Sequence, residues 1–506
     1  MYLLGIDIGT SGTKTVLFNE NGKALASYTG EYPLYQPQNG WAEQDPEDWW
    51  RATVDGIRAV LALIPEAAHD RIAVGLSGQM HGLVMLDKEG RLLRRSIIWC
   101  DQRTGEEVQQ MNRIVGEKRL IEISANPAMT GFTAAKILWV QNHEPEIYSK
   151  CAHILLPKDY IRYRLTGEFA TEVSDASGMQ LMDVKNRCWS SELLSAFNID
   201  RNLLGKMYES PELSGTIHAK AASATGLPVG TPVVAGAGDN PAAAIGTGIV
   251  RQGIAFNTIG SSAVIYAVTD GLQLDMEGRV HSLCASVPGK WTLMSCTQSA
   301  GLSLKWLRDT CCSAEVEQAK QENVDPYKIM DELASGVPVG ADKLLFLPYL
   351  MGERSPHPDP LCRGAFVGLS ARHGRPHLIR AVMEGVAYSQ RECLDVFREL
   401  GVSIERMIVC GGGGRSSLWK QMLADLYGCP VTTLKVDEGA ALGAALLAGV
   451  GTGVYSSVEQ ACESVVQYNE PQMPSQNAKV YEQYFVLYKK LYPRLKSVFD
   501  ELGSIN

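Results

Sequence analysis

Residues 3–28 read LLGIDIGTSGTKTVLFNENGKALASY, and this stretch decides the fold class. Apolar residues alternate with polar ones in three short runs, which predicts strands at 3–8, 14–18 and 23–28. A turn of small residues, Gly9-Thr10-Ser11-Gly12, separates the first two strands, and Asn21-Gly22 favours a tight hairpin before the third. Three adjacent antiparallel strands at the start predict an α/β fold that does not begin with a βαβ unit.

The same arrangement returns roughly 250 residues later. Residues 253–259 and 263–268 are predicted strands, and Gly260-Ser261-Ser262 is the turn between them. Two copies of one device indicate two domains with related cores and a cleft between them. We expect the first domain at 1–247 and the second at 248–506.

Periodic apolar residues and turn signals predict the other elements. A helix is expected at 45–63, where Pro46 occupies the helix start. The strand at 72–76 leads into the loop Ser77-Gly78-Gln79-Met80-His81-Gly82. Further predicted elements are strands at 343–346 and 407–409, helices at 416–426 and 477–499, and a close-packed helix at 439–445.

The composition excludes several classes of protein. The chain has 506 residues, of which 45% are hydrophobic and 20% charged, so disorder is not expected. A net charge of -9 argues against a nucleic-acid or membrane partner. No signal peptide and no apolar run of membrane length are evident. Twelve scattered cysteines without a CxxC pair indicate reduced thiols, and a cytoplasmic location is expected.

The turn at residues 9–12 has the composition of a phosphate-binding turn. Glycine and small hydroxyl residues let backbone N–H groups approach phosphate oxygens, and Lys14 adds a positive charge. Asp7 precedes this turn, and a carboxylate there can hold Mg²⁺ through water molecules. A structural turn without a ligand is the alternative for this turn alone. The matching turn at residues 260–262 favours phosphate binding by both.

Two glycine-rich segments follow predicted strands. Gly411-Gly412-Gly413-Gly414 allows either a tight strand-to-helix turn or a shelf for a nucleotide base. Asp239 lies in the segment Ala235-Gly236-Ala237-Gly238-Asp239-Asn240, just before the second half of the chain. In phosphoryl transfer a carboxylate can accept the proton of the attacking hydroxyl, so Asp239 is the candidate general base. A capping role is the alternative for such an aspartate.

Polar groups that suit a polyol site end two strand-like runs, Gln79-Met80-His81 and Trp99-Cys100-Asp101-Gln102-Arg103. A structural role is the alternative for each of these side chains. No histidine, cysteine or carboxylate spacing fits a dedicated metal centre, and no convincing serine nucleophile elbow is present.

Together these residues resemble the FGGY family of carbohydrate kinases. GFTAAKILWVQNH at 131–143 fits the first signature of the family, and GAFVGL at 364–369 with the residues up to Glu384 fits the second. More specific matches are SGQMHG at 77–82, LLPKDYIRYRLTGEFATEVSDASG at 155–178, AGAGDN at 235–240 and FLPYLMGERSPH at 346–357. The resemblance covers roughly residues 1–450.

The resemblance implies two actin-like (RNase H-like) domains with ATP and a sugar in the cleft. It implies that Asp239 is the general base and that Asp7 orients Mg²⁺. The implied phosphate-turn residues are Gly9, Thr10, Ser11, Lys14, Gly260, Ser261 and Ser262, and those near the adenosine are Gly412, Gly413 and Arg415. The implied sugar pocket contains Met80, His81, Trp99 and Asp239, with Asp101, Arg103 and Asp175 as further candidates. Ser261 and Cys100 depart from the residues common in the family, which are threonine and a polar residue.

The more specific motifs imply ATP-dependent phosphorylation of a ketopentose, D-xylulose, at O5. A kinase for ribulose, fuculose or gluconate is the first alternative. An actin-like ATPase without a sugar substrate and a catalytically silent sugar sensor are others. The oligomeric state stays open, with a homodimer as one outcome.

Overall fold

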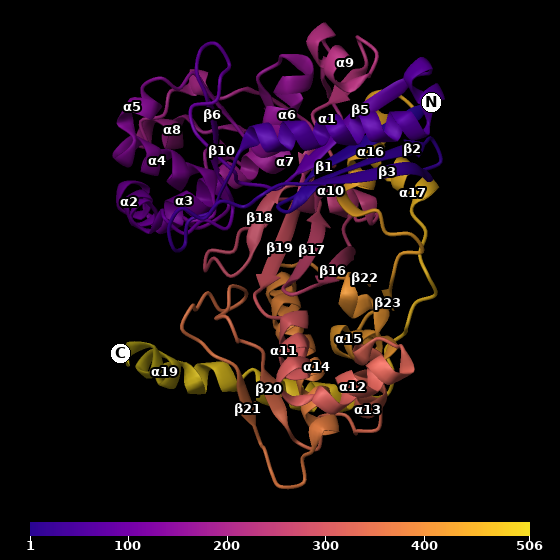
Figure 1. The fold of residues 1–506 in the computed structure, drawn as a ribbon. Helices are drawn as coiled ribbons and strands as arrows, with labels where there is room; N and C mark the ends of the chain where they lie inside the picture. Colours follow the sequence, from indigo (N-terminus) through magenta and orange to yellow (C-terminus); the bar gives the residue numbers. More distant parts are fainter. Residues whose placement is uncertain (506) are drawn as a thin grey trace.

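The computed structural model describes residues 1–505, which form two bodies, each built on one mixed β-sheet (Figure 1). The first sheet has the order β13 (Leu213–Thr216), β14 (Pro232–Val234), β5 (Ile72–Gly78), β1 (Tyr2–Ile8), β2 (Gly12–Asn19) and β3 (Ala24–Glu31), with β15 (Ala237–Gly238) beside β5. The second has the order β18 (His281–Cys284), β19 (Trp291–Thr297), β17 (Ala263–Thr269), β16 (Ile254–Ile259), β22 (Arg406–Cys410) and β23 (Val431–Thr432).

The predicted duplication is present in the strand pairing. β1 pairs antiparallel with β2 and parallel with β5. β16 likewise pairs antiparallel with β17 and parallel with β22. The predicted three-stranded start is also confirmed, because β2 pairs antiparallel with β3. Each body therefore places a tight turn at the same corner of its sheet.

Helices cover both sheets. In the first body these include α1 (Pro46–Leu63), α2 (Gly105–Val115), α3 (Glu117–Ser124), α4 (Thr133–His143), α6 (Pro157–Thr166) and α7 (Val173–Ala176). In the second they include α11 (Gly301–Cys311), α12 (Ser313–Glu322), α13 (Pro326–Ser335), α14 (Arg375–Glu399) and α15 (Ser417–Tyr427). The predicted helix start at Pro46 is confirmed, and the Asp45 side chain accepts a hydrogen bond from the backbone N–H of Glu47 as its cap. Within residues 1–505, no helix combines the length and apolar character needed to cross a bilayer.

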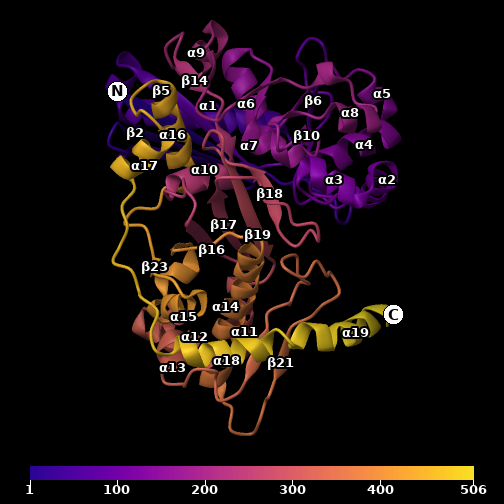
Figure 2. The same ribbon diagram turned by 180° about the vertical axis from the view of Figure 1, so that it is seen from behind.

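Two helices from late in the chain belong in space to the first body. Figure 2 shows α16 (Gly439–Gly451) and α17 (Val458–Val465) beside β2 and β5, far from their sequence neighbours in the second body. α16 packs on α10 (Asp239–Gly246) and on β1 and β5. A Cβ atom added at Gly5 would lie 2.0 Å from the carbonyl oxygen of Ala441, so the helix and strand backbones touch where glycine has no side chain.

The predicted helix at 477–499 is wrong in one respect, because the structure forms two helices there. These are α18 (Ala478–Tyr488) and α19 (Leu491–Ser504). Pro493 has no N–H to donate to the carbonyl of Lys489, and its ring excludes that carbonyl from a continuous helix. The predicted strand at 343–346 is displaced to β20 (Leu345–Leu347), after residues 341–343 with positive φ.

Candidate active site

Three neighbouring strands of the first sheet bring two carboxylates to the same edge. Asp7 on β1 is in register with Ser77 on β5, and Ser77 is in register with Ala237 on β15. Asp239 follows β15 directly as the first residue of α10. The carboxyl ends of parallel strands meet at one edge, so Asp7 and Asp239 face a common site. The Ser77 hydroxyl donates a 2.9 Å hydrogen bond to Asp7 Oδ1.

The two carboxylates lie in a poorly hydrated site, in which the charge of Asp7 raises the proton affinity of Asp239. Burial, followed by the negative charge of Asp7, raises the pKa of Asp239 to about 7, although Asn240 donates two hydrogen bonds to its Oδ1. Burial also raises the pKa of Asp7, against the hydrogen bond from Ser77 and the charge of Lys14. A carboxylate with a pKa near neutrality can take up and release a proton at physiological pH.

The first predicted phosphate turn lies next to this pair. The backbone N–H of Gly9 donates to the carbonyl oxygen of Gly12 at 3.0 Å, and Ser11 is exposed. Thr10 accepts a 2.9 Å hydrogen bond from the indole N–H of Trp99, which joins the turn to the predicted sugar pocket. The structure places Lys14 in an ion pair with Glu438, 2.7 Å from Nζ to Oε2, in the segment that leads into α16.

The second turn borders a cavity of about 510 Å³ in the second body. The backbone N–H of Gly260 donates to the carbonyl of Ser262 at 2.9 Å, so a backbone hydrogen bond closes this turn as well, although the turn is one residue shorter than the first. The predicted residues that line this cavity are Gly260, Ser261, Gly412, Gly413 and Arg415. Ser262 is exposed and is not among the lining residues.

The glycine run after β22 forms a tightly packed turn and also lines the cavity. A Cβ atom at Gly413 would lie 2.6 Å from Cβ of Ile259, so the turn packs tightly on β16, and the same residues form a cavity wall. Sequence reasoning missed the opposite wall, which is formed by Lys305, Tyr327, Lys328 and Asp331. These residues lie on α11 and α13 and carry no motif that could have identified them.

Met80 contacts the segment that carries Asp239, and His81 is the next residue in the same loop. A Cβ atom at Gly238 would lie 2.7 Å from Cγ of Met80, so Met80 contacts the residue before the candidate base. His81 adopts a φ of 69° and stacks on Phe132 with ring centroids 4.2 Å apart. Burial and the charge of Lys136 lower the pKa of His81 to about 3, so the imidazole is neutral. Its Nδ1 lies 3.0 Å from the Gly178 carbonyl and carries the proton, which leaves Nε2 as an acceptor.

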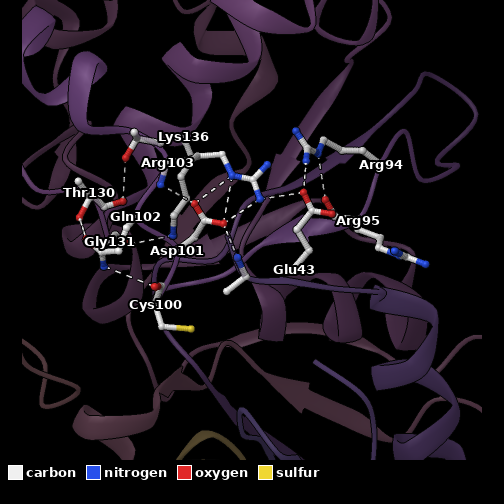
Figure 3. A network of polar contacts seen from close by, with 12 residues as sticks. Glu43, Arg94, Arg95, Cys100, Asp101, Gln102, Arg103, Thr130, Gly131 and Lys136 are labelled. Atoms are coloured by element: carbon white, nitrogen blue, oxygen red, sulfur yellow. Dashed lines mark hydrogen bonds and ion pairs between the residues drawn. The ribbon is translucent and has the colours of Figure 1, made fainter. Parts of the chain in front are cut away.

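The structure gives Asp101 and Arg103 a different place from the predicted one. Figure 3 shows the Asp101 carboxylate held by the Arg103 guanidinium, and Asp101 also accepts from the backbone N–H of Ala42 at 2.6 Å. Arg103 further pairs with Glu43 at 2.9 Å and stacks on Trp41. Both side chains are buried among these partners. They instead fix the loop that carries Trp99, whose side chain is 43% exposed.

Lys136 is a site residue that the sequence analysis did not select. Its ammonium group is fully buried and donates to the carbonyl oxygens of His81 at 2.8 Å and Gly131 at 2.7 Å. Burial lowers the pKa of Lys136 to about 7. The available signal was its position in the segment GFTAAKILW, where a lysine interrupts the apolar face of α4.

Asp175 also departs from the prediction. It is fully buried, and its carboxylate lies 3.1 Å from Lys158 Nζ in a cluster that includes Asp159 and Glu172. Burial raises the pKa of Asp175 to about 8. The hydroxyl of the neighbouring Ser174 accepts a 3.2 Å hydrogen bond from the backbone N–H of Gly238. This contact connects the buried cluster to the segment that carries Asp239.

The fold and the site define a two-domain kinase of the actin-like type, with a carboxylate pair at one sheet edge and a nucleotide-sized cavity beyond it. Residues 2–246 match the description "FGGY family of carbohydrate kinases, N-terminal domain", and residues 255–452 match the C-terminal domain of the same family. The chain therefore belongs to the FGGY family of carbohydrate kinases. The predicted α/β fold of two actin-like domains is confirmed.

The chain is similar over nearly its whole length to several named proteins. It is 38% identical to a xylulose kinase of Bacillus subtilis (strain 168), with 99% of each chain covered. It is 39% identical to a xylulose kinase of Escherichia coli (strain K12), with 98% of this chain and 99% of the relative covered. The crystal structure of xylulose kinase from Rhodospirillum rubrum superposes with a TM-score of 0.92 at 30% identity, covering 99% of this chain and all of that one.

Proposed function

We propose that this kinase transfers the γ-phosphoryl group of ATP to O5 of D-xylulose and releases D-xylulose 5-phosphate and ADP. The observation that carries the chemistry is the Asp7–Asp239 pair, in which the pKa of Asp239 is raised to about 7. The names of the most similar relatives supply the support for the sugar.

Asp239 acts as the general base. As O5 attacks the γ-phosphorus, the new O–P bond forms, the bond from the γ-phosphorus to the β–γ bridging oxygen breaks, and the hydroxyl proton passes to the Asp239 carboxylate. The hydrogen bonds from Asn240 fix Oδ1, so the other carboxylate oxygen is the one that receives the proton. Met80, neutral His81 and Trp99 form the pocket that orients the sugar, with His81 Nε2 accepting from a sugar hydroxyl.

ATP lies between the two bodies in this proposal. Its adenosine occupies the cavity next to Gly412, Gly413 and Arg415, where the two glycines expose backbone to the ligand. The turns at residues 9–12 and 260–262 bind the phosphates through backbone N–H groups. Lys14 contributes positive charge once it exchanges its partner Glu438 for a phosphate.

The carboxylate pair fits a magnesium ion bound together with ATP. Mg²⁺ is commonly held by one or two carboxylates, substrate phosphates and several water molecules. Asp7 and Asp239 supply hard oxygen ligands whose mutual repulsion a divalent cation relieves, and within residues 1–505 no cluster of three or more ligand side chains exists. Asp7 would hold the ion, which neutralises phosphate charge when bound.

Three further statements stay predictions. The domain division at residues 247 and 248 follows the main-chain duplication, with α16 and α17 returning to the first body. A cytoplasmic location is predicted from the scattered cysteines. A homodimer is predicted as one outcome for the oligomeric state.

A coupled assay of ADP release with a panel of D-xylulose, D-ribulose, L-fuculose, D-gluconate and no sugar tests the proposed function. We expect D-xylulose to give the highest kcat/KM and the reaction to require the sugar. Asp239→Asn should lower kcat by ~10²- to 10⁴-fold, whereas Asp55→Asn, at an exposed position on α1, should leave it unchanged. A preference for another sugar, or ADP release without any sugar, would overturn the assignment.

A further inference from the structure

Arg354 is held in a fixed position by the residues on either side of it. The carboxylate of Glu353 accepts from the backbone N–H of Gln298 at 2.8 Å, and the backbone N–H of Ser355 donates to the carbonyl of Cys296 at 3.1 Å. Both partners lie at the end of β19 in the second body. The backbone at residue 354 is therefore anchored to the sheet that faces the first body.

The Arg354 side chain reaches the sugar pocket of the first body. Its Nη2 lies 3.6 Å from Sδ of Met129, in the loop that leads to α4. Its positive charge lowers the pKa of both His81 and His281. The His81 ring stacks on Phe132, whose ring centroid lies 5.8 Å from that of His281. Arg354 and His81 thus approach one pocket from opposite bodies.

The guanidinium of Arg354 lacks a protein partner of matching strength. Among residues 1–505, no carboxylate oxygen lies within 4.0 Å of it, and Glu353 is engaged by backbone N–H groups. Its Nε is buried without a hydrogen-bond acceptor, and the Met129 thioether is only a weak one. Buried N–H donors nearly always find a partner, so this group points to a ligand oxygen. Arg103, by contrast, is paired with two carboxylates.

We propose that Arg354 is a specificity-determining residue that binds the hydroxyketone end of the sugar, at C1 and C2. This inference rests on the proposed function. Met80 contacts the segment before Asp239, the next residue, His81, stacks on Phe132, and Arg354 reaches Met129 in the loop just before Phe132. A ketose with O5 at Asp239 that passes Met80 and His81 therefore directs its other end toward Arg354. The planar guanidinium presents parallel N–H groups that match two adjacent oxygen acceptors, the C2 carbonyl and the C1 hydroxyl.

The test compares Arg354→Met with the matched control Arg363→Met. Arg363 is exposed and donates only to the carbonyls of Pro360 and Cys362. We expect Arg354→Met to raise KM for D-xylulose about 10- to 100-fold, the range for losing hydrogen bonds from a charged donor, with KM for ATP within twofold of the wild type. Arg363→Met should change neither constant. An unchanged KM for D-xylulose in Arg354→Met would refute the inference.

A second comparison uses 1-deoxy-D-xylulose, which lacks the C1 hydroxyl. In the wild type its kcat/KM should fall below that of D-xylulose, and in Arg354→Met the two sugars should become equivalent. Persistence of the difference in the variant overturns the role of Arg354, even if KM changes. Arg354→Lys keeps the charge without the planar fork and serves if the methionine variant fails to fold, with a partial loss expected. Wild-type protein that phosphorylates no pentulose would instead overturn the proposed function.

Discussion

Replacing Asp239 by Asn removes a negative charge from the carboxylate pair and changes little of its shape. The amide oxygen can still accept the hydrogen bonds that Asn240 donates to Oδ1. The variant cannot take the proton of the sugar hydroxyl, so kcat should fall by ~10²- to 10⁴-fold, the range for loss of a general base. The same substitution should stabilise the fold, because the wild type keeps a desolvated carboxylate next to Asp7.

The size of that stabilisation follows from the pKa of Asp239, which rises from 3.8 to about 7. Each pKa unit corresponds to ~1.36 kcal/mol, so ionisation of Asp239 costs the native state about 4 kcal/mol at most. Partial exposure of the side chain reduces this, and we expect about 1–3 kcal/mol at pH 8. That gain should appear as a rise of a few degrees in the thermal midpoint.

The stability difference between the wild type and Asp239→Asn should depend on pH. Between pH 4 and pH 7 the native state binds the Asp239 proton more tightly than the unfolded state, so wild-type stability falls as the pH rises through this window. Asp239→Asn lacks that loss. Calorimetric midpoints of both proteins should therefore lie close together near pH 4.5 and separate by pH 8. A variant that is less stable than the wild type at pH 8, or a gap that does not vary with pH, would contradict the desolvated carboxylate.

The pKa of Asp239 also predicts how the activity of the wild type depends on pH. Because only ionised Asp239 accepts the proton, kcat/KM should fall about tenfold per pH unit below pH 7. A flat profile from pH 5 to pH 8 would show that Asp239 is not the base. Gly443→Ala should destabilise the fold by about 1–3 kcal/mol and lower the thermal midpoint, because the new Cβ would lie 1.8 Å from a carbonyl oxygen of α10. The control Gly105→Ala, whose Cβ meets no atom within 4 Å, should leave the midpoint unchanged. Lys136→Met should raise KM for the sugar more than KM for ATP, because the loop that carries His81 loses the buried ammonium group that donates to its backbone carbonyl. Equal changes in both constants would indicate general destabilisation instead.

Local patterns in the sequence predict much of the fold. Alternation and the Asn21-Gly22 turn predict β1, β2 and β3, and the repeated strand–turn–strand device predicts the second sheet. Pro493 marks the break between α18 and α19 in the sequence, but apolar residues at helical spacing on either side, such as Tyr488 and Leu495, favour one continuous helix. The return of α16 to the first body could not be predicted, because it depends on glycines in strands several hundred residues away.

Some residues of the candidate site could be predicted from the sequence, and others could not. Asp7 lies near the end of β1, and Met80, His81 and Asp239 come shortly after strands. Strand ends that meet at one edge of a sheet bring such residues together. The burial of Asp101 and Asp175 could not be predicted in this way, because it depends on partners such as the backbone of Ala42 and the side chain of Lys158, which no local motif links to them. Charged residues in a loop after a strand look alike in sequence whether they face a ligand or a buried ion pair.

The crossing of α16 into the first body has a consequence for dissecting this protein. A fragment that stops at residue 247 would leave the glycine surfaces of β1 and β5 bare to water, since the helix that covers them is encoded after residue 438. Neither half of the gene thus encodes a self-sufficient unit. Truncation or split-protein designs need to carry residues 439–465 along with the amino-terminal portion, and a chain cut near residue 250 should hold together as a two-piece complex.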